Sequence, residues 1–255
     1  MPKPLVLLTQ AGFVAAVFAV WQAAITLTLV DPTILPAPAT VFAALAGLLR
    51  SPDFLSNAGD TLLRIIAAFL IGAPLALLTG VVIGENVNIG KSVSPFFNLV
   101  LAVPQSIFLP LFTLLFGLGF TEKLMFGITH VFFVVAVNTV AAVRHVSHEH
   151  VVAARSFGAS RWRIYRSIYL PAMAPHVMTG LRFGMIFNII GILLAEMYAS
   201  QTGLGVLLMQ WGESYNVGKL MAATIFISVM TIGMNEMMRI WEARLGRWQH
   251  SANRE

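Results

Sequence analysis

The sequence predicts an all-α integral membrane protein with six transmembrane helices. Of the 255 residues, 58% are hydrophobic and only 11% are charged, which is not the composition of a soluble domain. Long uncharged runs recur along the chain, and several approach the roughly 20 apolar residues that a helix needs to cross a bilayer. The lysines and arginines gather in alternate connections between these runs, which is typical of a multi-pass membrane protein.

The uncharged runs locate the spans. Residues 5–30 are too long an apolar stretch for a signal peptide, and a stiff proline-rich segment follows them instead of a cleavage site. Residues 92–121 carry three prolines and exceed one straight crossing, so a tilted or bent third helix is expected. The predicted spans are 5–30, 65–84, 95–117, 124–143, 183–198 and 220–238, with the fifth expected to begin nearer residue 177.

The segments between the first two spans receive separate interpretations. Residues 39–49 have helical apolar spacing but are too short to cross, so they are expected to lie along the outer surface. Residues 50–60 are interpreted as a polar connection. Asp60 and Arg64, spaced i,i+4, are interpreted as the solvated start of the second span.

The distribution of basic residues predicts the orientation. Six spans place both termini and the connection at 149–182 on one side of the membrane. That side carries 12 basic residues, namely Lys3, Lys91, Arg144, Arg155, Arg161, Arg163, Arg166, Arg182, Arg239, Arg244, Arg247 and Arg254. The other side carries 4, namely Arg50, Arg64, Lys123 and Lys219. The positive-inside rule makes the first side cytoplasmic, so the net charge of +5 reflects topology and no nucleic-acid partner is expected.

Several chemistries are not expected in this chain. The absence of cysteine excludes disulfides and thiol catalysis. Residues 84–92 imitate a phosphate-binding loop, but five residues separate the two glycines where that loop needs four. The cluster His145, His148 and His150 is interpreted as a solvated helix end in preference to a zinc site. No nucleophile–base pair or metal constellation is visible, so the chain is not expected to be an enzyme.

Polar residues inside the predicted spans are candidates for a translocation pathway. Glu196 lies in the outer half of the fifth span, where an unpaired charge is costly. Two interpretations stay open: these side chains line a water-filled path, or they bond the helices to one another. The candidates are Asn98, Gln105, Asn138, Asn188 and Glu196.

The connection at 149–182 is the most distinctive segment. It carries five arginines in an otherwise apolar chain, so it must lie in water at the membrane face. Alanine-rich residues 151–157 predict a short helix that Gly158 ends, and Ser160 is placed to cap a second one. Leu170-Pro171 is expected to end that second helix, because proline lacks a donor.

The spacing within this connection resembles a known motif. Ala153-Ala154, three residues, Gly158, nine residues, Ile168, one residue and Leu170-Pro171 resemble the EAA loop of ABC importer permeases. Val152 stands where that motif has glutamate. The flanking sequence is similar to the branch that handles nitrate, sulfonates and taurine, and the resemblance extends over residues 36–248.

The resemblance implies a type I ABC importer transmembrane fold with a cytoplasmic coupling helix, in the bacterial inner membrane. Two permease copies would pair as a homodimer and bind two cytoplasmic ATP-binding subunits, which hold the ATP and Mg; this chain would bind no cofactor. A periplasmic solute-binding protein would deliver a small solute such as a sulfonate, taurine, nitrate or a vitamin precursor. The implied coupling residues are Val152, Ala153, Ala154, Phe157, Gly158, Ile168, Leu170 and Pro171.

The same resemblance divides the chain. Residues 1–55 would hold the N-terminal span and the periplasmic surface helix, residues 56–242 an ABC transmembrane type-1 domain, and residues 243–255 a cytoplasmic tail. The competing class is a secondary transporter or channel that needs no ATPase. That class would be expected to show inverted repeats or ionisable relays, and the sequence shows no internal repeat.

Overall fold

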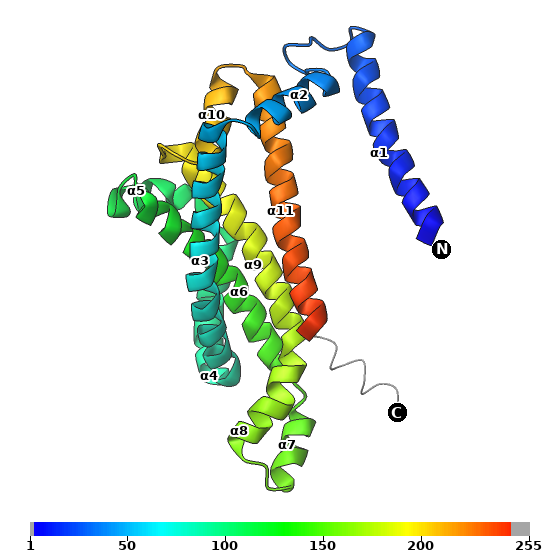
Figure 1. Ribbon diagram of the computed structural model, residues 1–255. Helices are drawn as coiled ribbons and strands as arrows, with labels where there is room; N and C mark the ends of the chain where they lie inside the picture. The colour runs from blue at the N-terminus through cyan, green and yellow to red at the C-terminus, as the bar shows by residue number, and fades with distance from the viewer. Residues whose placement is uncertain (1–2, 246–255) are drawn as a thin grey trace.

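A computed structural model describes residues 3–245, and within that range every regular element is a helix (Figure 1). Five of the described helices are long and apolar enough to cross a membrane, and one sharply bent pair supplies a sixth crossing. The five are α1 (Lys3–Thr26), α3 (Pro52–Glu85), α6 (Phe120–Arg144), α9 (Leu170–Ala199) and α11 (Val217–Leu245). The predicted all-α, six-span class is confirmed. Residues 246–255 of the predicted tail lie outside the described residues.

Helix α6 lies at the centre of the bundle, packed against α3 on one side and α9 on the other. The face of α3 toward α6 is a stripe of small residues at every fourth position, which lets the two backbones approach closely, as is common between membrane helices. The stripe consists of Ala68, Gly72, Ala76, Gly80 and Gly84, all buried. β-Carbons added to Gly180, Gly184 and Gly191 of α9 would lie equally close to side chains of α6.

We expect Gly80→Leu to disrupt this packing. A β-carbon at Gly80 would lie 2.6 Å from Cβ of Thr139 and 2.9 Å from the carbonyl oxygen of Ala136, so α3 and α6 would have to separate. Overpacking of this kind costs about 1–3 kcal/mol. Thermal unfolding of the detergent-purified protein should show a lowered midpoint. The matched control is Gly59→Leu on the same helix, where nothing lies within 4 Å; equal midpoints for the two variants would contradict the close packing.

The second crossing begins earlier than the sequence suggested. Helix α3 starts at Pro52, with the Ser51 hydroxyl accepting from the N–H of Phe54 as an N-cap. The predicted polar connection at 50–60 is therefore mostly helix. Its polar side chains do not mark a loop, and that of Asn57 is buried in the protein.

The third crossing is bent, as its prolines predicted. Helix α4 (Val87–Ala102) is followed, after a short 3₁₀ turn (Gln105–Phe108), by α5 (Leu109–Phe116), and the two parts meet at 87°. Pro104 precedes the 3₁₀ turn, where it breaks the helical hydrogen-bond pattern. The helix begins at Val87, well before the predicted residue 95, because the Asn86 side chain caps its first turn. The stretch that imitates a phosphate-binding loop is thus largely helical.

Two short helices close the upper end of the bundle in Figure 1. Helix α2 (Pro38–Leu48) agrees with the expected short helix at 39–49, whereas α10 (Leu204–Glu213) was not predicted. Both pack on α11 over one apolar cluster. The buried members of that cluster are Val41, Leu48, Phe54, Ala58, Leu204, Leu207, Ala222, Ala223 and Ile227.

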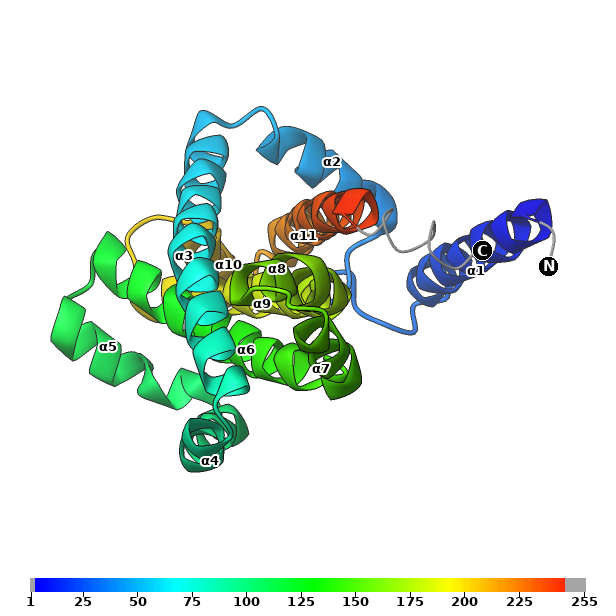
Figure 2. The ribbon, with the colours of Figure 1, turned by 90° about the horizontal axis from the view of Figure 1, so that it is seen from below.

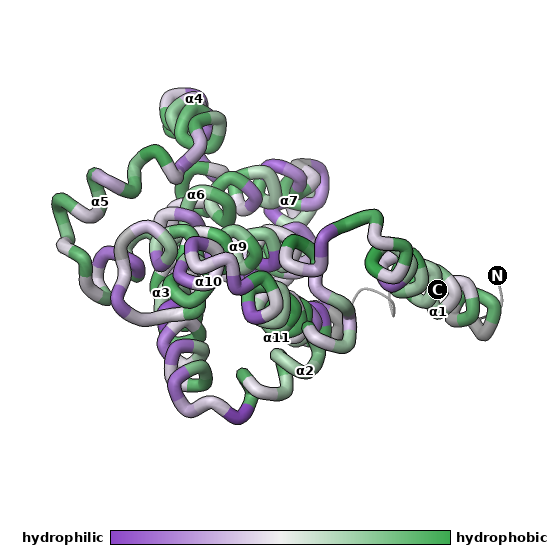
Figure 3. The backbone as a smooth tube through the Cα atoms, turned by 90° about the horizontal axis from the view of Figure 1, so that it is seen from above, coloured by the Kyte–Doolittle hydropathy of each residue, from purple (hydrophilic) through white to green (hydrophobic). Residues whose placement is uncertain are grey.

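Helix α1 stands apart from the bundle when it is viewed from below (Figure 2), and it contacts the rest chiefly through α2. Trp21 donates a hydrogen bond to the carbonyl of Pro36 at 3.0 Å, and Phe18 stacks on Phe42. Hydrophobic residues dominate α1 and the other crossings (Figure 3). No part of the crossing stretch of α1 is buried within the chain, which suits a helix surrounded by lipid.

The lower end carries the elbow, which we define as residues 148–169. It comprises α7 (His148–Ser156), α8 (Arg161–Ile164) and a π-helical turn (Tyr165–Tyr169), and it projects beyond the bundle (Figure 1). The expectation that Leu170-Pro171 ends the second elbow helix is wrong. Helical structure runs on into α9, because Pro171 occupies its first turn, where a missing N–H costs nothing.

Candidate functional site: the elbow and the polar residues of the bundle

The first elbow helix ends in a Schellman motif. Gly158 has a φ of +76°, and its N–H donates to the carbonyl of Arg155 at 2.9 Å. The N–H of Ala159 reaches back to the carbonyl of Ala154 at 3.0 Å. This pair of bonds satisfies the last carbonyls of the helix and favours glycine at the left-handed position. Ser160 then caps α8, as the sequence predicted, by accepting from the N–H of Arg163.

The tip of the elbow presents apolar side chains to solvent. The side chain of Phe157 is 91% exposed and that of Trp162 is 71% exposed. Val152 and Ala153 are also exposed, Ala154 is half-buried, and a β-carbon at Gly158 would meet nothing within 4 Å. The tip thus carries large apolar side chains that the described part of this chain does not cover. The elbow arginines around this tip, Arg155, Arg161, Arg163 and Arg166, are exposed as well.

The base of the elbow is fixed to the bundle. Val151 and Ile164 are buried, and the rings of Tyr165 and Tyr169 stack with centroids 5.5 Å apart. The carboxylate of Glu85, the last residue of α3, lies near the Tyr165 hydroxyl. Ile168 is half-buried at this base. The base of the elbow therefore packs against the bundle, whereas its tip is exposed.

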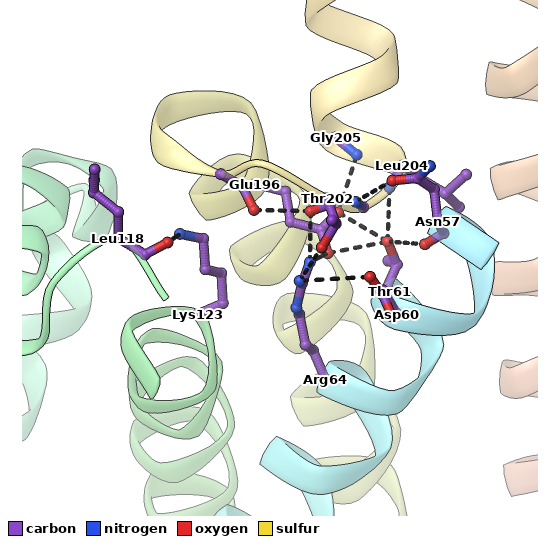
Figure 4. A network of polar contacts seen from close by, with 12 residues as sticks. Asn57, Asp60, Thr61, Arg64, Leu118, Lys123, Glu196, Thr202, Leu204 and Gly205 are labelled. Carbon is purple, nitrogen blue, oxygen red and sulfur yellow. Dashed lines mark hydrogen bonds and ion pairs between the residues drawn. The ribbon is translucent and has the colours of Figure 1, made fainter. Parts of the chain in front are cut away.

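A second polar site lies at the opposite end of the bundle, around Glu196 (Figure 4). Glu196 is 1% exposed, and its carboxylate forms an ion pair with Arg64 of α3 at 2.5 Å. The hydroxyl of Thr61 donates to the carboxylate at 2.9 Å, and the N–H of Gly205 donates at 3.0 Å. Because every partner of the buried charge is a donor, the ionised carboxylate is well solvated by the protein.

The same cluster holds the turn between α9 and α10. Arg64 donates to the carbonyl and the hydroxyl of Thr202, at 2.8 and 2.7 Å. The N–H of Gly203 donates to Asn57 Oδ1 at 2.6 Å. Gly203 has a φ of +119° and lies so close to the Glu196 carboxylate that a β-carbon there would overlap it. We name Asn57, Thr61, Arg64, Glu196 and the turn residues 202–205 the corner cluster.

Comparison with known proteins identifies the family. The family model described as binding-protein-dependent transport system inner membrane component matches residues 72–249, most of the chain. The chain belongs to this family. It is the permease component of an ABC importer, a transport component and not an enzyme.

The similar proteins agree with the sequence resemblance. The permease is 30% identical over 245 residues to the taurine transport system permease protein TauC of Escherichia coli, covering 93% of this chain and 88% of that protein. It is 27% identical to the putative aliphatic sulfonates transport permease protein SsuC of Bacillus subtilis, covering 93% and 86%. An inward-facing structure of the MetNI methionine ABC transporter matches with a TM-score of 0.55 at 18% identity, covering 86% of this chain and 98% of that one, which supports the fold.

The predicted pathway residues of the permease do not converge. Asn188 is fully buried and donates to the backbone carbonyl of Ile65, at 2.8 Å. Asn138 is half-buried and donates to the carbonyl of Val134 in its own helix. Asn98 is exposed on α4, and Gln105 lies in the 3₁₀ turn with its carbonyl oxygen buried and without a hydrogen-bond partner. The contacts of Glu196 and Asn188 are those expected of helix-bonding groups.

Two sequence interpretations need correction in the permease. Asp60 and Arg64 are not a solvated pair, because Arg64 is 6% exposed and turns to Glu196. Asp60 lies 4.0 Å from the guanidinium and is more exposed. The fourth span, predicted to begin at residue 124, also begins earlier, because α6 starts at Phe120. Glu122, in the first turn of α6, is fully buried with Lys123, whose Nζ lies 2.6 Å away and donates to the carbonyl of Leu118.

One member of the histidine cluster contacts a residue outside it. His145, at the end of α6, forms an edge-to-face contact with His176 of α9, with ring centroids 4.9 Å apart. Among the described side chains, no group of three or more histidines and carboxylates is arranged to hold a metal ion. His145 and His176 thus join the two helices that flank the elbow.

Proposed function

We propose that the elbow is the coupling element through which a cytoplasmic ATP-binding subunit drives this permease. The observation that carries the proposal is the exposed tip at Phe157 and Gly158, set on a packed base. The exposed ring of Phe157 projects from the tip, and the absence of a side chain at Gly158 leaves room around it. A groove on a partner can enclose such a ring. Val152, Ala153 and Ala154 would line the same contact, while Ile168, Leu170 and Pro171 connect it to α9.

The proposed assembly is a homodimer of permeases on two ATP-binding subunits, which hold the ATP and Mg. Exposed apolar side chains along α4 and α5, such as Phe96, Leu99, Ile107 and Leu114, give the second permease copy and the lipid their contacts. The bent third crossing would form a wall of the translocation pathway, because irregular backbone within a membrane is tolerated where it faces a cavity or protein. Of the five pathway candidates, Asn98 and Gln105 belong to this wall.

The proposed orientation puts the elbow and both termini in the cytoplasm. The lower ends of α1 and α11 point the same way as the elbow (Figure 1), and the elbow arginines favour the cytoplasmic face. A solute-binding protein would then dock on the opposite face, where α2 and α10 lie.

The proposed substrate class is a small sulfonate such as taurine. The names of the two relatives, one a taurine and one an aliphatic sulfonate permease, support this choice, and the proteins align over most of their lengths.

Co-purification and uptake test the proposal together. The tagged permease should retain two copies of an ATP-binding subunit per permease dimer. Proteoliposomes with that subunit and the binding protein encoded nearby should take up labelled taurine in the presence of ATP, and unlabelled aliphatic sulfonates should compete. A permease that purifies without an ATPase and transports without ATP would refute the coupling proposal. ATP-driven uptake that sulfonates fail to inhibit would refute the substrate class alone.

A further inference from the structure

A pocket of about 170 Å³ opens between α4 and α6, at the end of the bundle that carries the elbow. Ile83, Phe97 and Val140 form much of its apolar wall. Its polar lining groups are the Ser94 hydroxyl, the Asn98 amide and the Arg144 guanidinium. The lining therefore offers hydrogen-bond donors and one positive charge, and contains no carboxylate.

Arg144 lacks the ion pair that four other basic residues of the chain form. Arg64, Lys123, Arg182 and Arg239 each form an ion pair with a carboxylate. Among the described side chains, none forms a hydrogen bond or an ion pair with Arg144. A guanidinium without an anion beside an apolar pocket is a binding group for a carboxylate, sulfonate or phosphate.

A glycine determines where this guanidinium lies. A β-carbon added to Gly90 of α4 would overlap the terminal nitrogen Nη2 of Arg144. The side chain of Arg144 thus crosses from the end of α6 onto the first turns of α4. Because Gly90 has no side chain, the guanidinium of Arg144 can lie against α4 at the edge of the pocket.

We propose that Arg144, Ser94 and Asn98 form a binding site for a tetrahedral oxyanion. The pocket volume equals that of roughly five or six liquid water molecules, which is enough for a sulfonate or phosphate head group. The planar fork of Arg144 binds two of the oxygens of a sulfonate, and the hydroxyl and amide donate to the third. The anion is either the sulfonate of a transported solute leaving on the inner side, an assignment that rests on the proposed function, or the phosphate of a lipid head group.

The test uses the permease with its ATP-binding subunit in nanodiscs of phosphatidylcholine. Methanesulfonate is the probe, titrated at constant ionic strength while the thermal midpoint of the complex is followed. The wild-type midpoint should rise with the probe, and Arg144→Gln should weaken the apparent affinity about 10- to 100-fold, because charge-assisted hydrogen bonds are lost. The matched control is Lys91→Gln, which removes an exposed charge on α4 outside the pocket and should keep the wild-type response.

A second measurement separates the two sources of the anion. Native mass spectrometry of the complex in phosphatidylglycerol should show bound lipid that Arg144→Gln loses and Lys91→Gln retains, if the phosphate is the ligand. Prior lipid binding should then abolish the methanesulfonate response. If the sulfonate is the ligand, Arg144→Gln should change the probe response without changing lipid retention. If Arg144→Gln matches the wild type in both measurements, the site is refuted.

Taurine uptake distinguishes this inference from the proposed function. Uptake by the wild type together with wild-type binding by Arg144→Gln would refute the site and leave the substrate class standing. An Arg144-dependent response to methanesulfonate in a permease that does not transport taurine would refute the substrate class and leave the oxyanion site standing.

Discussion

Gly158→Trp should lower uptake by roughly tenfold or more while the permease still reaches the membrane. The indole would stand on the open tip of the elbow, where Phe157 is exposed and nothing lies within 4 Å of the glycine. Only about 1.4 kcal/mol of lost docking energy is needed for a tenfold effect. The measurements are ATP-dependent uptake in proteoliposomes and the amount of ATP-binding subunit retained by the tagged permease.

Two further variants separate bulk from backbone strain at the elbow. Gly158→Ala introduces the strain of a left-handed position, about 1–2 kcal/mol, without bulk. Phe157→Ala removes an exposed ring without strain, so it should leave the stability of the isolated permease unchanged and weaken retention of the ATP-binding subunit. Normal uptake and normal retention by Gly158→Trp would show that the elbow tip is not the docking surface.

Glu196→Gln should destabilise the permease strongly. The variant leaves the buried guanidinium of Arg64 without its anion, and breaking a buried ion pair in this way costs about 3–5 kcal/mol. The midpoint of thermal unfolding should fall, and uptake should fall with it. Combining Glu196→Gln with Arg64→Gln should restore part of the loss, which would reveal a direct coupling of about 0.5–3 kcal/mol in a double-mutant cycle.

Asp60→Asn is the matched control for that experiment. Asp60 also neighbours Arg64, but at 4.0 Å and with a side chain that is 42% exposed, so its removal should cost no more than about 1 kcal/mol. A different result would change the interpretation of Glu196. If Glu196→Gln abolished uptake while the unfolding midpoint stayed at the wild-type value, the carboxylate would act in the translocation pathway and not in holding the corner cluster.

The sequence predicted the crossings well because lipid imposes a simple requirement on composition and length. The bend of the third crossing followed from its prolines, and the two elbow helices from an alanine-rich run, a glycine and a capping serine. The prediction at Pro171 was wrong because the effect of proline depends on its position. Proline breaks a helix when it lies in the interior, but it is compatible with the first turn. Sequence spacing does not distinguish these two positions.

The corner cluster could not be predicted, because its partners are far apart in the chain. Arg64 and Glu196 are separated by 132 positions, and the i,i+4 spacing of Asp60 and Arg64 offered a local partner that the fold does not use. The helix α10 was not predicted from the sequence. The sequence signal for the turn before α10 was the glycine at position 203. Its φ of +119° is a conformation that few residues other than glycine adopt.

The continuity of the elbow with α9 has a mechanical consequence. Helix α9 has 30 residues, a length of about 45 Å, and it begins directly at the π-helical turn of the elbow. Its other end carries Glu196 and hence the attachment of α10. A displacement applied at the elbow would therefore reach the corner cluster at the opposite end of the bundle through one continuous helix. In the proposed orientation, this helix would connect nucleotide-driven motion in the cytoplasm with solute delivery on the other face.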